Sequence, residues 1–201
     1  MTFENPFENQ SHPKPAIATK WLRGLVLAVL LMVGGGILLL SHAATLSSAR
    51  EYQIKAVYLY NFTLFITWPK SAFSSYRAPF RICILGDDPF KKQIDIVVRN
   101  EKAQNRPIVV ERIREVKPFC QIVYISRSEQ RHLPDIIAAL EQHPILSVSD
   151  LPEFVVNGGM IKFYTRRKQV RLAIDPQTLE ETGLQASANL LRVSKIVRRS
   201  R

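Results

Sequence analysis

Histidine, cysteine and glycine are scarce in this chain, and each shortage excludes a kind of chemistry. The 201 residues include four histidines, two cysteines and eight glycines. After residue 43 only His132 and His143 remain, and they are too far apart in sequence for the ligand spacing of a histidine metal site. The G-x-S-x-G, P-loop and G-x-G-x-x-G motifs are also absent, so the usual exposed nucleophile and phosphate-binding turns are missing. We expect no metal, no cofactor and no catalytic residues, and therefore a protein that is not an enzyme.

The one long hydrophobic run lies near the N-terminus. Residues 24–40 contain no charged side chain, follow the basic residues Lys20 and Arg23, and precede Ser41-His-Ala43. A positive flank, an apolar stretch and a small-residue cleavage site are the layout of a secretory signal. We expect residues 1–43 to be a tail and signal peptide cleaved after Ala43, which leaves residues 44–201 as one domain in the bacterial periplasm. The alternative is an uncleaved anchor in the inner membrane with the domain facing the periplasm.

Basic residues outnumber acidic ones in the predicted domain, residues 44–201. The formal net charge at pH 7 is +11, and the first 43 residues, with three basic and two acidic side chains, account for one unit of it. A surplus of this size favours nucleic acid, an anionic membrane or an acidic protein as the binding partner. Because an exported chain meets little nucleic acid, we expect no nucleic-acid binding.

Residues 50–68 predict a helix that ends before Pro69, because proline disfavours helical conformation in the residue before it. Between residues 56 and 66 only Asn61 and Thr63 are polar, so the helix is apolar on nearly every face. One face must pack on the domain. The other is either covered by the same chain or contacts a partner, or a second subunit as in a homodimer. The candidate partner-binding residues are Tyr58, Tyr60, Phe62 and Phe65.

The rest of the chain alternates between apolar runs and helical segments. Predicted strands cover residues 80–85, 107–112, 121–125 and 145–148, and predicted helices cover residues 88–98 and 128–142. Alternating residues in 160–164 and 170–174 predict an antiparallel hairpin at a sheet edge, followed by a helix over residues 184–197. This order predicts an α/β fold: a three-layer α/β/α sandwich with a mostly parallel sheet and a C-terminal antiparallel hairpin.

Two short segments are candidates for binding a small molecule. Asp87 and Asp88 follow a strand at its carboxyl end, where open α/β sheets bind ligands, although Asp88 also suits the N-cap of the next helix. Gly158 and Gly159 offer bare backbone to a ligand, or simply form a tight turn. These four residues would serve a periplasmic small-molecule binding module, which is the alternative to a protein regulator.

The two cysteines are the clearest chemical signal in the sequence. Cys83 and Cys120 both lie beside apolar strands of a chain expected in an oxidising compartment. With no other cysteine present, they form either the only disulfide possible within the chain or two buried free thiols. The strands that carry them can be neighbours in an α/β sheet. Such a bridge would stabilise the fold by about 3 to 4 kcal/mol.

Taken in order, these segments resemble the YfiR-like family of periplasmic regulators from about Glu51 to Val197. The resemblance rests on Ile54-Lys-Ala-Val-Tyr-Leu-Tyr-Asn-Phe62 with Trp68-Pro69, Ile82-Cys-Ile-Leu-Gly-Asp-Asp-Pro-Phe90, Arg106-Pro-Ile108, Cys120-Gln-Ile-Val-Tyr-Ile125, Leu146-Ser-Val-Ser-Asp150, Gly158-Gly-Met-Ile161 and residues 183–191. Each segment is weakly informative alone, whereas their order and spacing together are specific.

The resemblance implies a protein that binds the periplasmic sensor domain of an inner-membrane diguanylate cyclase, holds it inactive, and so lowers cyclic di-GMP and biofilm formation. It also implies an outer-membrane lipoprotein that sequesters the inhibitor. The family's cysteine pair matches Cys83 and Cys120, and a second pair known in some members is absent here. Two departures concern the binding surface: Asn105 stands where glycine is common, and Ala173-Ile-Asp175 replaces a more acidic strand.

Overall fold

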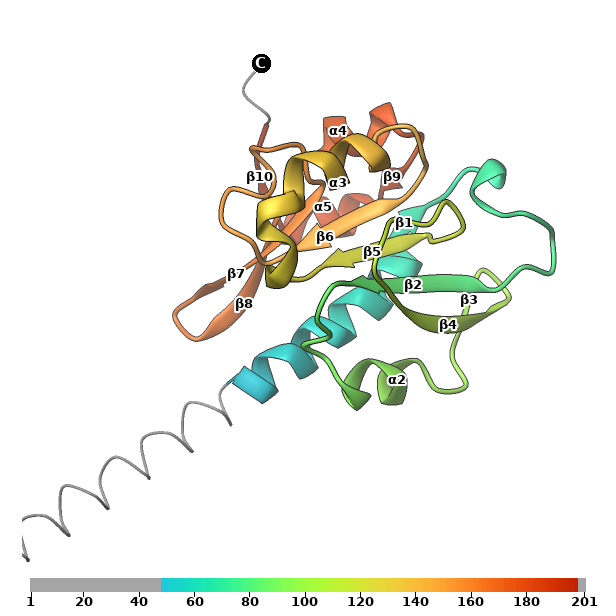
Figure 1. Cartoon of the computed structure of the whole chain (residues 1–201), viewed down its shortest axis with the longest axis horizontal. Helices are drawn as coiled ribbons and strands as arrows, with labels where there is room; N and C mark the ends of the chain where they lie inside the picture. The colour runs from blue at the N-terminus through green and yellow to red at the C-terminus, as the bar shows by residue number, and fades with distance from the viewer. Residues whose placement is uncertain (1–47, 199–201) are drawn as a thin grey trace, which may run out of the picture. The chain divides into compact units, whose positions relative to one another are not determined.

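Residues 48–198 are described by the computed structural model of the protein, and they build one large sheet with helices packed on it (Figure 1). The predicted tail and signal peptide, residues 1–43, lie outside the described residues. Within 48–198, none of the helices combines the length and the apolar character that crossing a membrane requires.

The main sheet has eight strands in the order β10-β8-β7-β6-β5-β2-β4-β3. The strands are β2 (Phe80–Leu85), β3 (Lys102–Ala103), β4 (Arg106–Ile113), β5 (Ile122–Ile125), β6 (Leu146–Ser149), β7 (Ile161–Arg166), β8 (Gln169–Ile174) and β10 (Lys195–Ile196). Neighbours from β4 to β7 run parallel, whereas β7 and β8 form an antiparallel hairpin. The short β10 pairs with the end of β8, so the predicted edge hairpin is partly covered. A separate two-stranded sheet joins β1 (Ile66–Thr67) to β9 (Gln185–Ala186).

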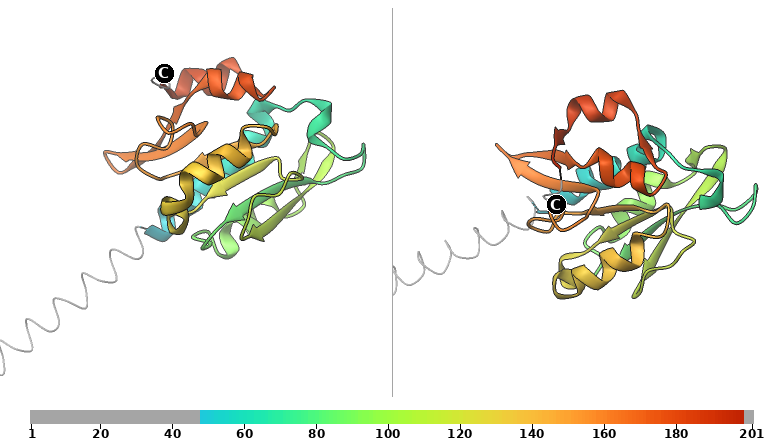
Figure 2. Two further views of the ribbon diagram at one scale, coloured as in Figure 1. Left: turned by 45° about the horizontal axis from the view of Figure 1, so that its top comes forward. Right: turned by 90° about the horizontal axis from the view of Figure 1, so that it is seen from above.

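Strands β2 and β5 are buried on both faces, which is why they form nearly continuous apolar runs in the sequence. In β2, Ile82 and Ile84 point into one core and Cys83 and Leu85 into the other. The first core is covered by a helix over residues 48–65, called the first helix below, and by α2 (Lys92–Val98), α4 (Pro176–Glu181) and α5 (Ala188–Val193). The second is covered by α3 (Leu133–Leu140), on the opposite side of the sheet in Figure 2. The predicted three-layer, mostly parallel α/β fold is confirmed.

The C-terminal third differs from the sequence prediction. The predicted helix over residues 184–197 is wrong, because β9, α5 and β10 occupy that stretch. The Ser187 side chain accepts a hydrogen bond from the backbone N–H of Leu190 and starts α5, and Ser194 returns to extended conformation. The short helix α4 was not predicted, although Asp175 caps it and Pro176 occupies its first turn.

Two other helices begin later than predicted. The segment after β5 starts as a 3-10 helix (Arg127–His132) and becomes α-helical only at Leu133. Asp88 does not cap α2, because Lys91, with a positive φ of 52°, separates it from the first helical residue, Lys92. The Asp88 carboxylate instead accepts hydrogen bonds from the backbone N–H groups of Phe90 and Lys91, which closes a turn before the helix.

Candidate functional site

Cys83 and Cys120 form a disulfide in the core on the α3 side of the sheet. Cys83 lies in the middle of β2, and Cys120 lies just before β5, which pairs with β2 in parallel register. The two Cα atoms are 6.0 Å apart, and both residues are almost completely buried, at 0% and 1% exposure. The predicted bridge is therefore present, and a reductant can reach it only when this part of the core opens.

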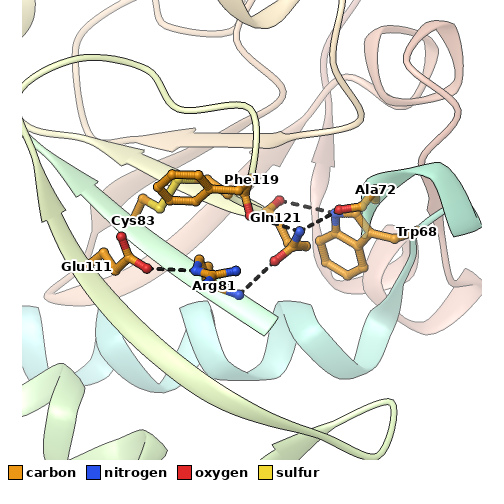
Figure 3. The surroundings of a disulfide bond; sticks show 8 residues. Trp68, Ala72, Arg81, Cys83, Glu111, Phe119 and Gln121 are labelled. Atoms are coloured by element: carbon orange, nitrogen blue, oxygen red, sulfur yellow. Dashed lines mark hydrogen bonds and ion pairs between the residues drawn. A yellow bond between two sulfur atoms is a disulfide. The ribbon is translucent and has the colours of Figure 1, made fainter. Parts of the chain in front are cut away.

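Gln121, the residue after Cys120, joins the bridged strands to the segment that follows the first helix (Figure 3). Its side-chain amide donates a hydrogen bond to the carbonyl of Ala72 and accepts one from the backbone N–H of Arg81, at 2.6 and 2.7 Å. Its own backbone carbonyl accepts a hydrogen bond from the indole Nε1 of Trp68 at 3.1 Å. Gln121 thus links the segment after the first helix to the residue that follows the disulfide cysteine Cys120.

Arg106, the first residue of β4, holds a nearby loop in place. The Arg106 guanidinium donates hydrogen bonds to the carbonyls of Ser75 and Ala78, and it lies 4.0 Å from the ring centroid of Phe73. It therefore fixes the loop between the first helix and β2. Asn105 precedes it with a positive φ of 63°, a conformation that asparagine tolerates better than most residues.

A buried ion pair, which the sequence did not reveal, fixes the first helix to the sheet. Lys55 Nζ lies 2.6 Å from the carboxylate of Asp150, the residue after β6, and the two side chains are 1% and 3% exposed. Asp150 also accepts hydrogen bonds from the Tyr52 hydroxyl and from Nε of Arg127, and Lys55 pairs in addition with Glu51. The signal for this pair was that Lys55 is the only charged residue between positions 52 and 69.

The ionisation of this cluster follows from its burial and its cations. Burial acts to raise the pKa of Asp150, but hydrogen bonds and charges of Lys55 and then Arg127 outweigh it, so the pKa lies below its usual range. Burial, followed by the negative charge of Asp150, raises the pKa of Tyr52 to about 12. At neutral pH Tyr52 therefore keeps its proton, and its hydroxyl donates a hydrogen bond to the Asp150 carboxylate.

The face of the first helix that points away from the core is apolar and exposed. Ile54, Val57 and Leu64 are 40%, 45% and 54% exposed, and Phe65 is 37% exposed. Together with Asn61, the first three recur at intervals of three and four residues and so lie along one side of the helix. We call Ile54, Val57, Leu64 and Phe65 the apolar helix face.

The four predicted partner-binding residues differ in how far the structure exposes them. Phe62 is fully buried, with its ring centroid 6.0 Å from that of Phe163, because it lies on the same side of the helix as the core residue Leu59. Tyr58 and Tyr60 are half-buried against that core. Only Phe65 of the predicted four belongs to the apolar helix face.

The structure does not bring the four candidate ligand-binding residues together. Asp87 and Asp88 lie at the carboxyl end of β2, near Arg114 and paired with Arg112 respectively. Residues 158–159 precede β7, and because β2 and β7 run in the same direction within the sheet, they lie at its opposite end.

The two glycines have local explanations. A Cβ atom on Gly159 would lie 2.3 Å from the Phe154 ring, so only glycine allows that ring to pack there. Gly158 has a φ of +98° and lines a cavity of about 290 Å³ with the hydroxyl residues Ser147 and Thr178. Both residues therefore serve the turn before β7.

In the part of the chain that the structure describes, no three His, Cys, Asp or Glu side chains are grouped so as to hold a metal ion. The fold and the contacts above define a disulfide-bonded α/β sandwich domain that presents an apolar helix face. A family model described as YfiR/HmsC-like matches residues 52–195. The match covers most of the chain, so the protein belongs to the YfiR/HmsC-like family, whose members are periplasmic regulatory proteins without catalytic activity. The family resemblance predicted from the sequence is confirmed.

Proposed function

We propose that this protein is a periplasmic, non-enzymatic regulator that binds the periplasmic sensor domain of an inner-membrane diguanylate cyclase. Binding lowers the production of cyclic di-GMP and with it biofilm formation. Family membership supports this class of partner. The observation that carries the proposal is the apolar helix face, where Val57 and Leu64 expose about half of their surface on a helix fixed to the domain.

A rigid helix with one apolar side suits recognition of a protein groove. The Lys55–Asp150 pair on the inner side and the Gln121 hydrogen bonds after the helix hold it in one orientation. Binding therefore costs little conformational entropy, and apolar anchors at helical spacing fit a groove on the partner.

Inhibition then requires a difference in affinity and no chemistry in this chain. If the regulator binds the inactive conformation of the cyclase more tightly than the active one, binding shifts the population toward the inactive form. The charge of +10 on residues 44–201 speeds the encounter with an acidic partner and makes association weaken with salt. A second partner, the outer-membrane lipoprotein implied by the family, would withdraw the regulator by competing for it.

The test compares lysine substitutions at exposed apolar residues of the first helix and of α2. Val57→Lys/Leu64→Lys places cations on the apolar helix face, whereas Ile96→Lys places one on α2 at a residue that is 52% exposed. We expect the first variant to bind the purified sensor domain at least tenfold more weakly and to leave cyclic di-GMP high in cells, and the second to behave as wild type. Circular dichroism of both variants checks that they fold.

Two outcomes contradict the proposal. One is unchanged cyclic di-GMP in a deletion strain under several envelope stresses. The other is wild-type affinity of Val57→Lys/Leu64→Lys for the sensor domain, which would move the contact away from the first helix.

A further inference from the structure

The β7–β8 hairpin has one buried face and one open face. In its register Tyr164 lies opposite Arg171 and Arg166 opposite Gln169, so these four side chains share the same face. The alternate residues, such as Phe163, are buried in the core covered by the first helix. The open face lies on the α3 side of the sheet.

Five cations surround a cavity of about 380 Å³ on this open face. They are Arg166, Arg167 and Arg171 of the hairpin, Arg192 of α5 and Lys195 of β10. No carboxylate lines the cavity, and within residues 48–198 none of the five makes an ion pair; the hydrogen bonds of Arg171 and Arg192 go to neutral amides. We call this cavity and its rim the basic hairpin face. Within residues 48–198, no acidic side chain neutralises the positive charge of the basic hairpin face.

The two-residue turn of the hairpin holds two basic residues in an unfavourable backbone conformation. Arg167 and Lys168 form the two-residue loop between β7 and β8, and both have positive φ, 52° and 62°. Such a loop strongly prefers Asn-Gly, because residues with longer side chains seldom adopt positive φ. Residues that break a local preference in this way often serve binding.

Exposed aliphatic residues adjoin the cations. Val193, which lines the basic cavity, is 66% exposed. A second cavity of about 360 Å³ shares Tyr164 and Lys195 with the first and is lined mainly by apolar residues, including Val156 and Val197, with a single carboxylate. The hairpin thus presents a basic cavity next to a mainly apolar one.

We propose that the basic hairpin face binds the anionic phospholipid surface of a membrane. Arginine side chains bind phosphate in bidentate geometry, and each Lys or Arg near an anionic membrane strengthens binding about fivefold. An acidic protein would match the cations but not the adjoining apolar hollow, whereas a phospholipid presents a phosphate next to aliphatic chains. This inference goes beyond the proposed function, because it needs no protein partner.

The experiment uses residues 44–201, because both cores consist of residues within 48–198 and because residues 24–40 would bind lipid by themselves. Co-sedimentation with phosphatidylcholine vesicles, with and without phosphatidylglycerol, measures partition at low and high salt. We expect binding only to the anionic vesicles, and less of it as salt rises. Arg167→Asn/Lys168→Gly should weaken partition on the order of 25-fold. Its melting temperature should be unchanged or higher, because the new pair suits the turn.

A matched control removes two charges elsewhere. Lys92→Gln/Arg99→Gln alters α2, which packs next to β4, far from β8 in the strand order, and should weaken partition much less. Val193→Ser should weaken it several-fold if the apolar contact contributes. The proposal would be overturned if the hairpin variant and the α2 control lost vesicle binding equally, or if wild type did not bind anionic vesicles at low salt. A third outcome would assign the cations to the protein partner instead. In that case wild type does not bind the vesicles, and Arg167→Asn/Lys168→Gly loses binding to the sensor domain.

Discussion

Lys55 and Asp150 are 95 positions apart in the sequence, and their side chains meet at 2.6 Å in the interior. Because successive residues of a helix point about 100° apart, the inward direction of Lys55 decides which residues face outward. Ile54 and Val57 are exposed on the other side of the same turn. The ion pair therefore sets the rotation of the first helix as well as its position.

Removing one partner of this pair should destabilise the protein strongly. Lys55→Met keeps most of the length of the side chain but leaves the buried Asp150 without its closest cation, so we expect a loss of about 3 kcal/mol in the free energy of unfolding. Urea denaturation measures it. The exposed Lys92→Met should change stability by less than about 0.5 kcal/mol. Equal losses of unfolding free energy in the two variants would contradict a stabilising role of the Lys55–Asp150 pair.

Asp150 should also make stability depend on pH in the acid range. Its pKa is lower in the folded protein than in the unfolded chain, so its contribution is present above the unfolded value of about 3.9 and is lost as pH falls through the folded value. Asp150→Asn should therefore flatten the decline in unfolding free energy below about pH 4. Parallel acid-denaturation curves for the variant and wild type would contradict this.

The disulfide should be inaccessible in the native state and important for stability. Native, unreduced protein should show no titratable thiol, because both cysteines are in the disulfide. Reduction should require denaturant, because both are buried. Cys83→Ala/Cys120→Ala should lower the free energy of unfolding by about 3 to 4 kcal/mol. Dithiothreitol should destabilise wild type under unfolding conditions and leave the double variant unaffected, which separates loss of the bridge from loss of packing.

The exported form should begin at Ala44. The apolar run of residues 24–40 followed by Ser41-His-Ala43 predicts cleavage at that point. Intact-mass spectrometry of the periplasmic fraction measures it directly. Recovery of the full 201-residue chain from membranes would instead support the anchored alternative.

The sheet was predictable because burial on both faces leaves a simple signature. Strands β2 and β5 are buried throughout, apart from Arg81, and their apolar runs end at Gly86 and at Ser126. Helix α4 was missed although its signal, Asp175 followed by Pro176, was present, because a helix of six residues with two buried side chains shows little periodicity.

The candidate site was less predictable, for two physical reasons. The first helix is apolar all round, so periodicity could not show that Phe62 faces the core and Leu64 faces outward. The pairing of Lys55 with Asp150 depends on how the helix crosses the sheet, which no local pattern records. The basic hairpin face likewise combines residues from β7, β8, α5 and β10 that only the folded chain brings together.

The disulfide also alters the covalent connectivity of the chain. It spans a sequence separation of 37 residues, and the loop it closes contains α2, β3 and β4 with the exposed turn at Gln104 and Asn105. A protease that cuts at this turn therefore leaves two pieces still linked through Cys83 and Cys120. A nick there would not by itself release a fragment, because the two pieces can separate only after the disulfide is reduced.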